Sequence, residues 1–369
     1  MSEHHQPLPD LPPPITSNGA LGWMRQHLFS SPLNIFLTLL SLYILSIIVP
    51  NIINWAFIDA NWTGTDRTAC DANPNGACWT FIHVRLNQIL FGLYYGQHPD
   101  QIWRPITAFA ILAGLVGLLL LPRMRFKAWL GIGIVLLYPF VAFALIHGEW
   151  LGLPVAGSSQ WGGLMLTFIL ASTGIVAALP LGILLALGRR SEMPLVRAFS
   201  VTYIEFWRGT PLITVLFMAS VMLPLFFPSG VEFDKVARAL IGITLFQSAY
   251  TAEAIRGGLQ AIPRGQYEAA DALGLGYWKK TIFIILPQAL KISIPGIVNT
   301  FIELFKDTSL VSIIGLLDLL NMAQTASRSL EWKGYDVEAY IFAAILFWIF
   351  CYGISRYSQH LEKTLHTGH

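Results

Sequence analysis

The sequence is short of charge, and this shortage decides its class. Only 12% of its 369 residues are Asp, Glu, Lys or Arg, and the mean hydropathy is +0.58. Because soluble domains carry about 25% charged residues, these values exclude an ordinary water-soluble globular protein. The net charge is +2, and the basic residues lie between apolar runs and form no single basic patch. Nucleic acid is therefore not an expected ligand.

Motifs for metal and nucleotide chemistry are also missing. The chain has three cysteines, and no CxxC or Cys/His cluster suggests a metal site. No GxxxxGK[ST] segment is present, so the sequence has no phosphate-binding loop of that type. We therefore expect no metal or cofactor in this chain and no enzymatic activity of its own. Any ATP is expected to be bound with magnesium and hydrolysed by a partner.

Long uncharged runs are what the sequence has instead, and they predict an all-α integral membrane protein. Five gaps between charges are long enough to cross a bilayer, and three later runs span it only if flanking basic side chains reach the surface. The eight expected spans lie within Leu33–Val49, Arg104–Arg123, Lys127–Glu149, Glu149–Arg189, Arg208–Glu232, Ala239–Ala252, Ile292–Ile302 and Ala339–Ser355. We interpret Ser309–Leu320 as a re-entrant or interfacial helix, and a ninth span is the alternative.

The distribution of Lys and Arg predicts the orientation. With alternating spans and a cytoplasmic N-terminus, fifteen of these residues lie inside and eight lie outside. Both termini are then cytoplasmic, and the polar, proline-rich start leads into an uncleaved first span. Cys70 and Cys78 fall outside, where an oxidising space favours a disulfide worth roughly 2–3 kcal/mol. Two free thiols are the alternative.

The chain divides near Leu151–Gln160. Residues 1–30 form a polar cytoplasmic tail, and residues 31–155 form an N-terminal extension with three spans and an outer loop. Residues 160–362 hold the other five spans and every recognisable motif. The role of the extension is left open by the sequence.

A short stretch between two spans stands out from the rest. Residues 266–273 are good helix formers, and Gly274 is placed to end that helix in a left-handed cap, with Gly276 loosening the turn. A helix of two turns is not stable alone, so a docking partner would explain it. Glu268 and Asp271 offer charge, and three alanines leave a slim surface. An ordinary cytoplasmic loop is the alternative.

The spacing in this stretch resembles a known family. Glu268-Ala269-Ala270 is followed after three residues by Gly274, and after nine more by Ile284, one residue and Leu286-Pro287. This pattern resembles the cytoplasmic "EAA" loop of binding-protein-dependent ABC importer permeases. The segments FWRGTPLI, AYTAEAIRGGLQAIPRGQYEAA, LPQAL and KDTSLVSIIG are similar to the histidine, glutamine and arginine permeases. The three-span extension resembles the larger permease subunits of general L-amino-acid systems.

The resemblance implies a mechanism and a set of partners. It implies a bacterial inner-membrane permease subunit that moves polar L-amino acids inward. The implied partners are two ATPase subunits, a second permease subunit and a periplasmic amino-acid-binding protein. The residues implied to couple to the ATPase are Gln266, Glu268, Ala269, Ala270, Asp271, Gly274, Gly276, Leu286 and Pro287.

Polar groups near the spans are candidates for a substrate path. They are Gln247, Glu253, Glu303, Lys306 and Asp307. For each of them, anchoring at the interface or bonding between helices is the alternative. Two other classes of protein compete with the importer. One is a secondary transporter or channel that works without an ATPase, which the EAA spacing disfavours. The other is a membrane scaffold, which the polar residues at the span ends disfavour.

Overall fold

The structure is a computed structural model that describes residues 19–121, 126–228 and 233–365. The N-terminal proline-rich segment, Arg123 and Arg125 lie outside the described residues. The chain forms two compact units, residues 1–80 and 81–369, each of which is considered by itself. Helices make up most of both units, and the one strand of the described residues has two residues, Leu317–Asp318. The predicted all-α fold is confirmed.

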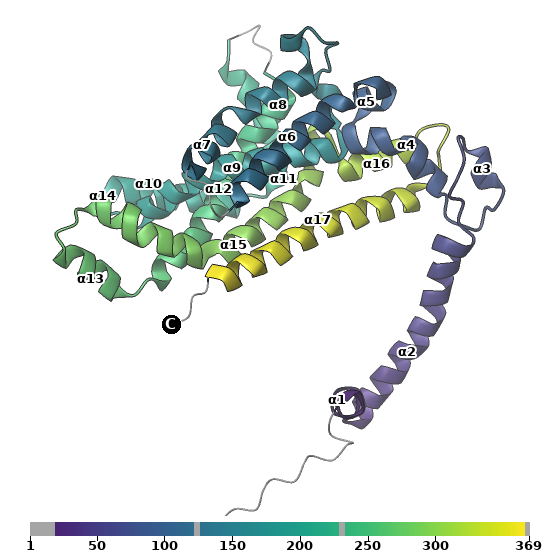
Figure 1. Ribbon diagram of the computed structural model, residues 1–369, viewed down its shortest axis with the longest axis horizontal. Helices are drawn as coiled ribbons and strands as arrows, with labels where there is room; N and C mark the ends of the chain where they lie inside the picture. Colours follow the sequence, from purple (N-terminus) through teal and green to yellow (C-terminus); the bar gives the residue numbers. More distant parts are fainter. Residues whose placement is uncertain (1–18, 122–125, 229–232, 366–369) are drawn as a thin grey trace, which may run out of the picture. The chain divides into compact units, whose positions relative to one another are not determined.

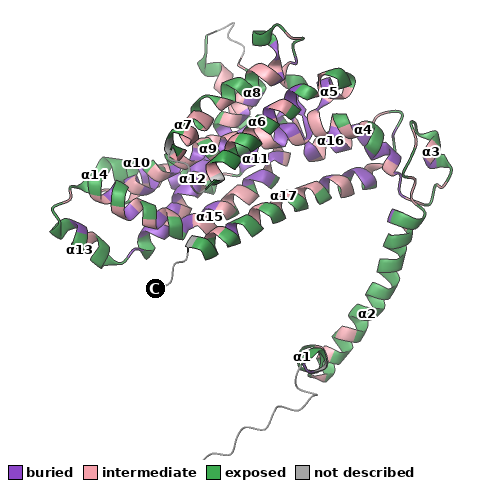
Figure 2. Cartoon of the chain, in the orientation of Figure 1, coloured by how far each residue is buried: buried purple, intermediate pink, exposed green. Residues whose placement is uncertain are grey.

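The first unit consists of one long helix and a small loop structure. Its elements are α1 (Gly19–His27), α2 (Pro32–Ile53), a π-helical turn (Asn54–Ile58) and α3 (Thr68–Asp71) (Figure 1). Ser31 caps α2 by accepting a hydrogen bond from the Asn34 amide. With 22 residues, α2 is about 33 Å long, enough for a hydrocarbon core. None of its residues is buried by protein, as the burial colouring shows (Figure 2).

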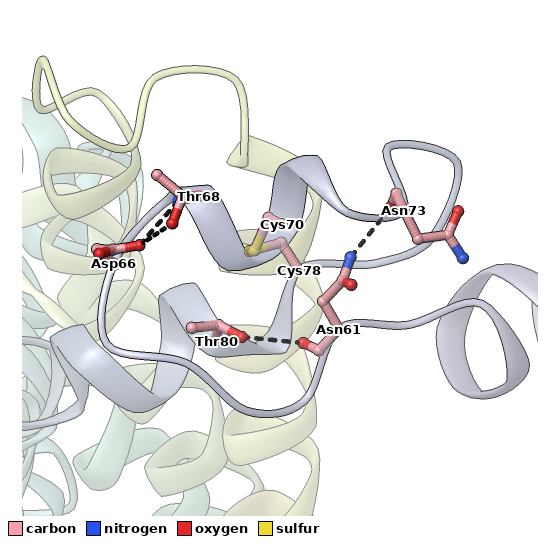
Figure 3. The surroundings of a disulfide bond; sticks show 7 residues. All are labelled: Asn61, Asp66, Thr68, Cys70, Asn73, Cys78 and Thr80. Atoms are coloured by element: carbon pink, nitrogen blue, oxygen red, sulfur yellow. Dashed lines mark hydrogen bonds between the residues drawn. A yellow bond between two sulfur atoms is a disulfide. The ribbon is translucent and has the colours of Figure 1, made fainter.

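A disulfide organises the loop that follows α2. Cys70 and Cys78 are joined through their sulfur atoms, with their Cα atoms 5.6 Å apart (Figure 3). Asn61 pairs with Cys78 through the backbone, and its side-chain amide donates to the Asn73 carbonyl at 3.0 Å. Both cysteines are buried within the unit. The loop is therefore closed by one covalent link and several short-range hydrogen bonds.

The second unit is a helical bundle, with α4 (Trp79–Phe91) beginning at its boundary. Next come α5 (Leu93–Gln97), α6 (Trp103–Leu120), α7 (Lys127–Leu136), α8 (Tyr138–His147), α9 (Gly163–Arg189), α10 (Pro194–Gly209) and α11 (Leu212–Val221). The remaining elements are α12 (Lys235–Ala261), α13 (Arg264–Ala272), α14 (Tyr277–Lys280), a π-helical segment (Thr281–Ile285), α15 (Leu286–Asp307), β1 (Leu317–Asp318), α16 (Leu319–Ser327) and α17 (Asp336–Leu365). Short 3-10 turns occupy Pro99–Gln101, Glu149–Leu151, Ser158–Gln160, Leu223–Phe226 and Thr308–Ile314.

Six stretches of the described chain are helical, long and apolar enough to cross a membrane. They are Pro32–Ile58, Pro99–Leu119, Trp129–His147, Gly163–Arg189, Tyr277–Ile314 and Asp336–Thr364. Each corresponds to one of the eight expected spans. The other two expected spans correspond to α11, which has ten apolar residues, and α12, which is long but rich in polar residues.

The interpretation of Ser309–Leu320 as one helix is wrong. The chain forms a 3-10 turn over Thr308–Ile314 and reverses at Gly315, whose φ is 78°. It then pairs through β1 with Gly162 and Gly163 before α16 begins. A seven-residue 3-10 turn rises only about 14 Å, so a ninth span is excluded for this segment as well.

Helix α12 is the centre of the bundle and packs against α9, α10, α11 and α15. Small residues make the closest approaches possible. A Cβ atom on Gly258 would lie 2.3 Å from the Ala289 carbonyl oxygen of α15, and one on Gly182 would lie 2.8 Å from a Thr251 methyl group. Such contacts between membrane helices rely on van der Waals packing of small residues. Small residues on both α12 and its neighbour α9 therefore allow the helices of the bundle to pack closely.

Glycines also join the N-terminal extension to the rest of the bundle. Gly92, between α4 and α5, pairs with Trp161 just before α9, and its φ is 96°. A Cβ atom there would lie 2.4 Å from the Gly162 nitrogen. Gly163 has a φ of 65°, and a Cβ atom on it would meet the Ile89 carbonyl oxygen at 2.1 Å. Only glycine suits these two left-handed, crowded positions.

A buried arginine completes the extension. Arg104 at the start of α6 donates to the carbonyls of Leu145, Ile146 and Pro154 at 2.8–2.9 Å. Two of these carbonyls end α8, where a cation is favoured by the helix dipole. Tyr95 donates to the same Ile146 carbonyl at 2.6 Å, and burial raises the pKa of Tyr95 to about 12, so it remains a donor.

Candidate functional site

Helix α13 carries the EAA stretch, and its end has the expected geometry. Gly274 has a φ of 68°, which confirms the predicted left-handed cap. The Leu275 amide donates to the Ala270 carbonyl at 3.2 Å, and the Gly274 amide donates to the Asp271 carbonyl at 2.9 Å. These two bonds form a Schellman motif, which satisfies the carbonyls at the helix end. The sequence therefore stops the helix after nine residues.

One face of α13 is held by the bundle. Ala270 is only 1% exposed, so it does not belong to the slim outer surface that the three alanines were expected to form. The Arg190 guanidinium, at the end of α9, donates to the Tyr267 hydroxyl at 3.0 Å and lies 5.5 Å from the centre of its ring. The same group donates to the Leu259 carbonyl of α12 at 2.7 Å. Arg190 thus ties α13 to two membrane helices.

The other face of α13 is bare. We call this face the docking face, defined by Glu268, Ala269, Ala272 and Leu273. All four residues are exposed, and the Leu273 side chain is 77% exposed. An exposed leucine beside two alanines and one carboxylate, on a helix anchored from behind, suits contact with another protein. An exposed Leu273 side chain does not stabilise the chain by itself, because it is not buried against other residues.

The remaining residues of the EAA stretch connect α13 to α15. The Lys280 ammonium forms an ion pair with Asp271 at 2.5 Å, so Asp271 is matched within the chain rather than offered to a partner. The Gln288 amide donates to the Gln266 side chain at 3.2 Å. Gly276 caps α14 with ordinary negative φ. These contacts fix the angle between α13 and the start of α15.

A π-helical segment precedes Pro287, and proline explains it. The ring of a proline clashes with the carbonyl four residues earlier, here Phe283, and it has no amide hydrogen to donate. The chain instead widens over Thr281–Ile285, where the Leu286 amide donates to the Thr281 carbonyl five residues back. Wide turns of this type are frequent at functional positions. Leu286 and Pro287 therefore mark the joint between the α13 loop and the α15 span.

Glu253 lies in an arginine cluster at the ends of α9, α10 and α12. Its carboxylate pairs with Arg256, with Arg189 at 3.4 Å and with Arg208 at 3.9 Å. Arg189 also donates to Glu205 at 2.9 Å. The Glu253 side chain is 19% exposed, so these partners compensate a partly desolvated charge. This arrangement favours bonding between helices over direct contact of Glu253 with a substrate.

Gln247 and the charges of α15 lie along one helix pair. Gln247 is buried in α12 and donates to the Thr300 carbonyl of α15 at 3.1 Å. One turn further along α15, Glu303 and Lys306 are exposed, and Asp307 is half-buried within electrostatic range of both. The structure does not bring all five candidates into one site, because Glu253 belongs to the arginine cluster.

Sequence reasoning missed two features of this region. Asn299 is exposed four residues before Glu303 and seven before Lys306, so the three side chains form a polar stripe on one face of α15. The spacing was a signal that could have revealed it. Arg189 and Arg190 are adjacent basic residues at the end of an expected span, and no local pattern indicates their separate partners on α10, α12 and α13.

Charged residues from distant parts of the chain gather at two ends of the bundle. Arg190 contacts Tyr267 of α13, and the adjacent Arg189 belongs to the arginine cluster around Glu253. Arg85 of α4 pairs with Glu331, which follows α16, at 2.7 Å. Figure 1 shows α13 and α14 at one end of the bundle and α16 toward the other. Among the described residues, no three His, Cys, Asp or Glu side chains are placed to hold a metal ion.

Comparison with known proteins identifies relatives over the full chain. The family profile described as "Binding-protein-dependent transport system inner membrane component" matches residues 178–367. The inner membrane amino-acid ABC transporter permease protein YhdY of Escherichia coli K12 is 53% identical over 367 residues, covering 98% of this chain and 97% of the relative. The glutamate/glutamine/aspartate/asparagine transport system permease protein BztC of Rhodobacter capsulatus is 43% identical, covering 97% of this chain and 96% of the relative.

One solved structure is similar to about half of the chain. A crystal structure of an amino acid ABC transporter with histidines is 30% identical, with a TM-score of 0.49, and covers 55% of this chain and 92% of that chain. The two full-length relatives therefore include a counterpart of the N-terminal extension, and this solved structure has its match in about half of the chain.

Proposed function

Since the chain belongs to the family of binding-protein-dependent transport system inner membrane components, we propose that it is the permease subunit of an ABC importer for polar L-amino acids. The named relatives support this substrate class, because YhdY is called an amino-acid permease and BztC a glutamate, glutamine, aspartate and asparagine permease. ATP is hydrolysed by a separate ATPase. The chain lies in the bacterial inner membrane with both termini in the cytoplasm.

One observation carries the coupling part of the proposal. Helix α13 is fixed to the bundle by Tyr267 and Ala270 while its docking face is bare. A helix held in this way transmits force instead of yielding to it. We propose that the docking face fits a groove of the ATPase, with Leu273 as the apolar contact and Glu268 as the charged one.

The connections of α13 indicate where the force goes. On one side α13 follows α12 through Ile262 and Pro263, and on the other it leads through α14 and the π-helical segment to α15. Movement of α13 therefore displaces α12 and α15 relative to each other. These helices are joined midway by Gln247 and the Thr300 carbonyl, so the change reaches the polar stripe.

The polar stripe of α15 supports a substrate path shared with a second permease subunit. Asn299, Glu303 and Lys306 are exposed on a helix that crosses the membrane. Charged side chains that face lipid are costly, so another protein surface or a water-filled path is expected to cover them. Opposite charges one turn apart suit an amino acid, which carries an ammonium and a carboxylate.

The test is to substitute residues at or beside the docking face of α13 without changing the packing of the bundle. We expect Gly274→Asp and Glu268→Arg each to reduce ATP-dependent amino-acid uptake at least tenfold. Asp at position 274 carries a left-handed backbone cost of about 1 kcal/mol and places an anion in the contact. Arg at position 268 reverses the charge that meets the ATPase. Folding is expected to persist, because both residues are exposed.

The matched control is Glu192→Arg, which reverses an exposed glutamate in the turn between α9 and α10. Uptake and co-purification of the ATPase are measured for all three variants and for the unchanged protein. The control is expected to stay within twofold of the unchanged protein. Normal uptake by both loop variants would show that α13 is only a connector, and uptake that persists without ATP would indicate a secondary transporter.

A further inference from the structure

A hollow with several polar side chains in its lining lies where the N-terminal extension meets the rest of the bundle. Its volume is about 490 Å3, within the range of roughly 300–1,000 Å3 that small-molecule sites occupy. One wall comes from α4 and α5, and the other from α16 and the residues just after it. The polar lining residues are Arg85, Gln88, Gln97, Thr325, Arg328 and Ser329.

Fixed contacts hold the two walls together. Phe81 at the start of α4 packs against the fully buried Trp332, with ring centres 5.6 Å apart. One turn further along α4, Arg85 pairs with Glu331 at 2.7 Å. Within the first wall, Gly96 lets α5 approach α4, since a Cβ atom there would lie 2.7 Å from the Gln88 Cβ. The hollow is therefore built by packing and not by a flexible loop.

The hollow offers more positive groups than the chain itself neutralises. Arg85 uses one terminal nitrogen for Glu331, and its Nε is buried without a hydrogen-bond partner among the described residues. Arg328 is exposed and forms no ion pair with any described residue. Planar guanidinium groups bind carboxylates with paired hydrogen bonds. The amide groups of Gln88 and Gln97 add further donors.

We propose that this hollow binds the carboxylate of a free amino acid on the side from which the substrate is imported. The side of the membrane and the substrate class rest on the proposed function. Arg328 and Arg85 hold the carboxylate, and Glu331, which is half-exposed beside them, faces the ammonium. Charges of both signs fit a zwitterion, whereas an acidic side chain of another protein would need only the arginines. The extension then supplies one wall of a binding site.

A local labelling experiment tests the proposal on the complete transporter in nanodiscs, without the soluble binding protein. Thr325→Cys places a thiol in the lining, in a Cys351→Ser background, and the rate of maleimide labelling is measured against L-glutamine concentration. We expect L-glutamine to slow labelling, and L-glutaminamide, which has no carboxylate, to have no effect. Adding Arg328→Gln is expected to raise the half-protecting concentration at least tenfold. Lys333→Gln, an exposed cation outside the lining, is expected to change it less than twofold.

Each other outcome overturns the proposal. L-glutamine that fails to protect the thiol, or equal protection with and without Arg328, shows that no carboxylate of a free amino acid binds there. Binding of the soluble binding protein to the nanodiscs is measured separately. If Arg328→Gln weakens that binding but leaves protection by L-glutamine unchanged, the carboxylate that meets Arg328 belongs to the binding protein, and the proposal is overturned. ATP-dependent uptake by the unchanged transporter is measured in parallel. Uptake without protection refutes this site alone, and absence of uptake refutes the proposed function.

Discussion

Helices α2 and α12 differ in composition and in what covers them. The span that contains α2 has a mean hydropathy of 2.2, and protein buries none of its window. Helix α12 buries thirteen of its 27 residues against neighbouring helices, yet it is too polar to count among the apolar spans. Hydropathy therefore detects the apolar α2 and passes over the more polar α12. Burial by protein is not the reason, because α9 buries twelve of its 27 residues and still counts as an apolar span. Helix α12 is more polar than α2, and it is the helix at the centre of the bundle.

The same difference separates the two compact units. Residues 59–80 are held by the Cys70–Cys78 bond and by hydrogen bonds between near neighbours such as Asn61 and Asn73. The bundle is held by contacts between segments far apart in sequence, as between α12 and α15. Changes in the bundle should therefore affect the whole protein, and changes in the first unit should remain local.

The largest effect is expected at Gly258, where α12 touches α15. We predict that Gly258→Val lowers the free energy of unfolding by about 3 kcal/mol, the upper end of overpacking costs. Its Cβ atom would lie 2.3 Å from the Ala289 carbonyl, a backbone atom that can move only if α15 moves. Thermal unfolding of the purified complex measures the loss.

Gly257→Val is the matched control for that prediction. A Cβ atom at Gly257 would meet nothing within 4 Å, although it lies in the same helix one residue earlier. The intrinsic helix cost of valine is the same at both positions, so the difference between the variants isolates the contact with α15. Equal melting temperatures for Gly258→Val and Gly257→Val would show that α12 is not tightly packed against α15 at Gly258.

Much of the fold follows from the sequence because it depends on local chemistry. Gly274 indicated a left-handed helix end, and the structure has it. The uncharged runs located the six apolar spans. Ser309–Leu320 was misread because an apolar run does not reveal that Gly315 turns the chain or that β1 pairs with Gly162. Partners brought together from distant segments leave no local pattern.

The candidate site shows the same limit. The EAA spacing predicted the residues of α13, but not that Asp271 pairs with Lys280 or that Ala270 faces the bundle. Glu253 was identified as a polar group near a span end, and its three arginine partners come from three different helices. A role assigned from sequence is therefore most secure where neighbours in the chain decide it.

A smaller effect is expected from Glu253→Gln. This change leaves the guanidinium groups of Arg189, Arg208 and Arg256 without their shared carboxylate. Removing a charged hydrogen-bond partner from a partly buried position costs about 1.5–3 kcal/mol. We predict a loss of stability in this range in thermal unfolding, together with reduced uptake, because the cluster joins α9, α10 and α12.

Glu205→Gln is the control for the arginine cluster. Glu205 also pairs with Arg189, but its side chain is 56% exposed and it forms one ion pair among the described residues. Exposed pairs contribute about 0–1 kcal/mol, so this variant is expected to resemble the unchanged protein. If Glu253→Gln and Glu205→Gln lowered stability equally, the burial of Glu253 would not strengthen its ion pairs. The arginine cluster would then contribute no more to the packing of α12 than an exposed ion pair does.

The smallest effect on the bundle is expected from the disulfide. We predict that Cys70 and Cys78 are oxidised in the native membrane and that replacing both with serine leaves uptake and bundle melting unchanged. The chain-entropy model assigns this bond roughly 2–3 kcal/mol, and only the loop that it closes should lose that stabilisation. Hydrogen exchange of residues 59–80 is therefore expected to accelerate, while α12 stays protected.

Cys351→Ser is the control for loss of a thiol elsewhere. Free thiols under alkylating, non-reducing conditions would refute the predicted bond in the membrane. A fall in the melting temperature of the bundle equal to that of Gly258→Val would show that the first unit and the bundle are not independent, because a local bond would then support contacts far from it.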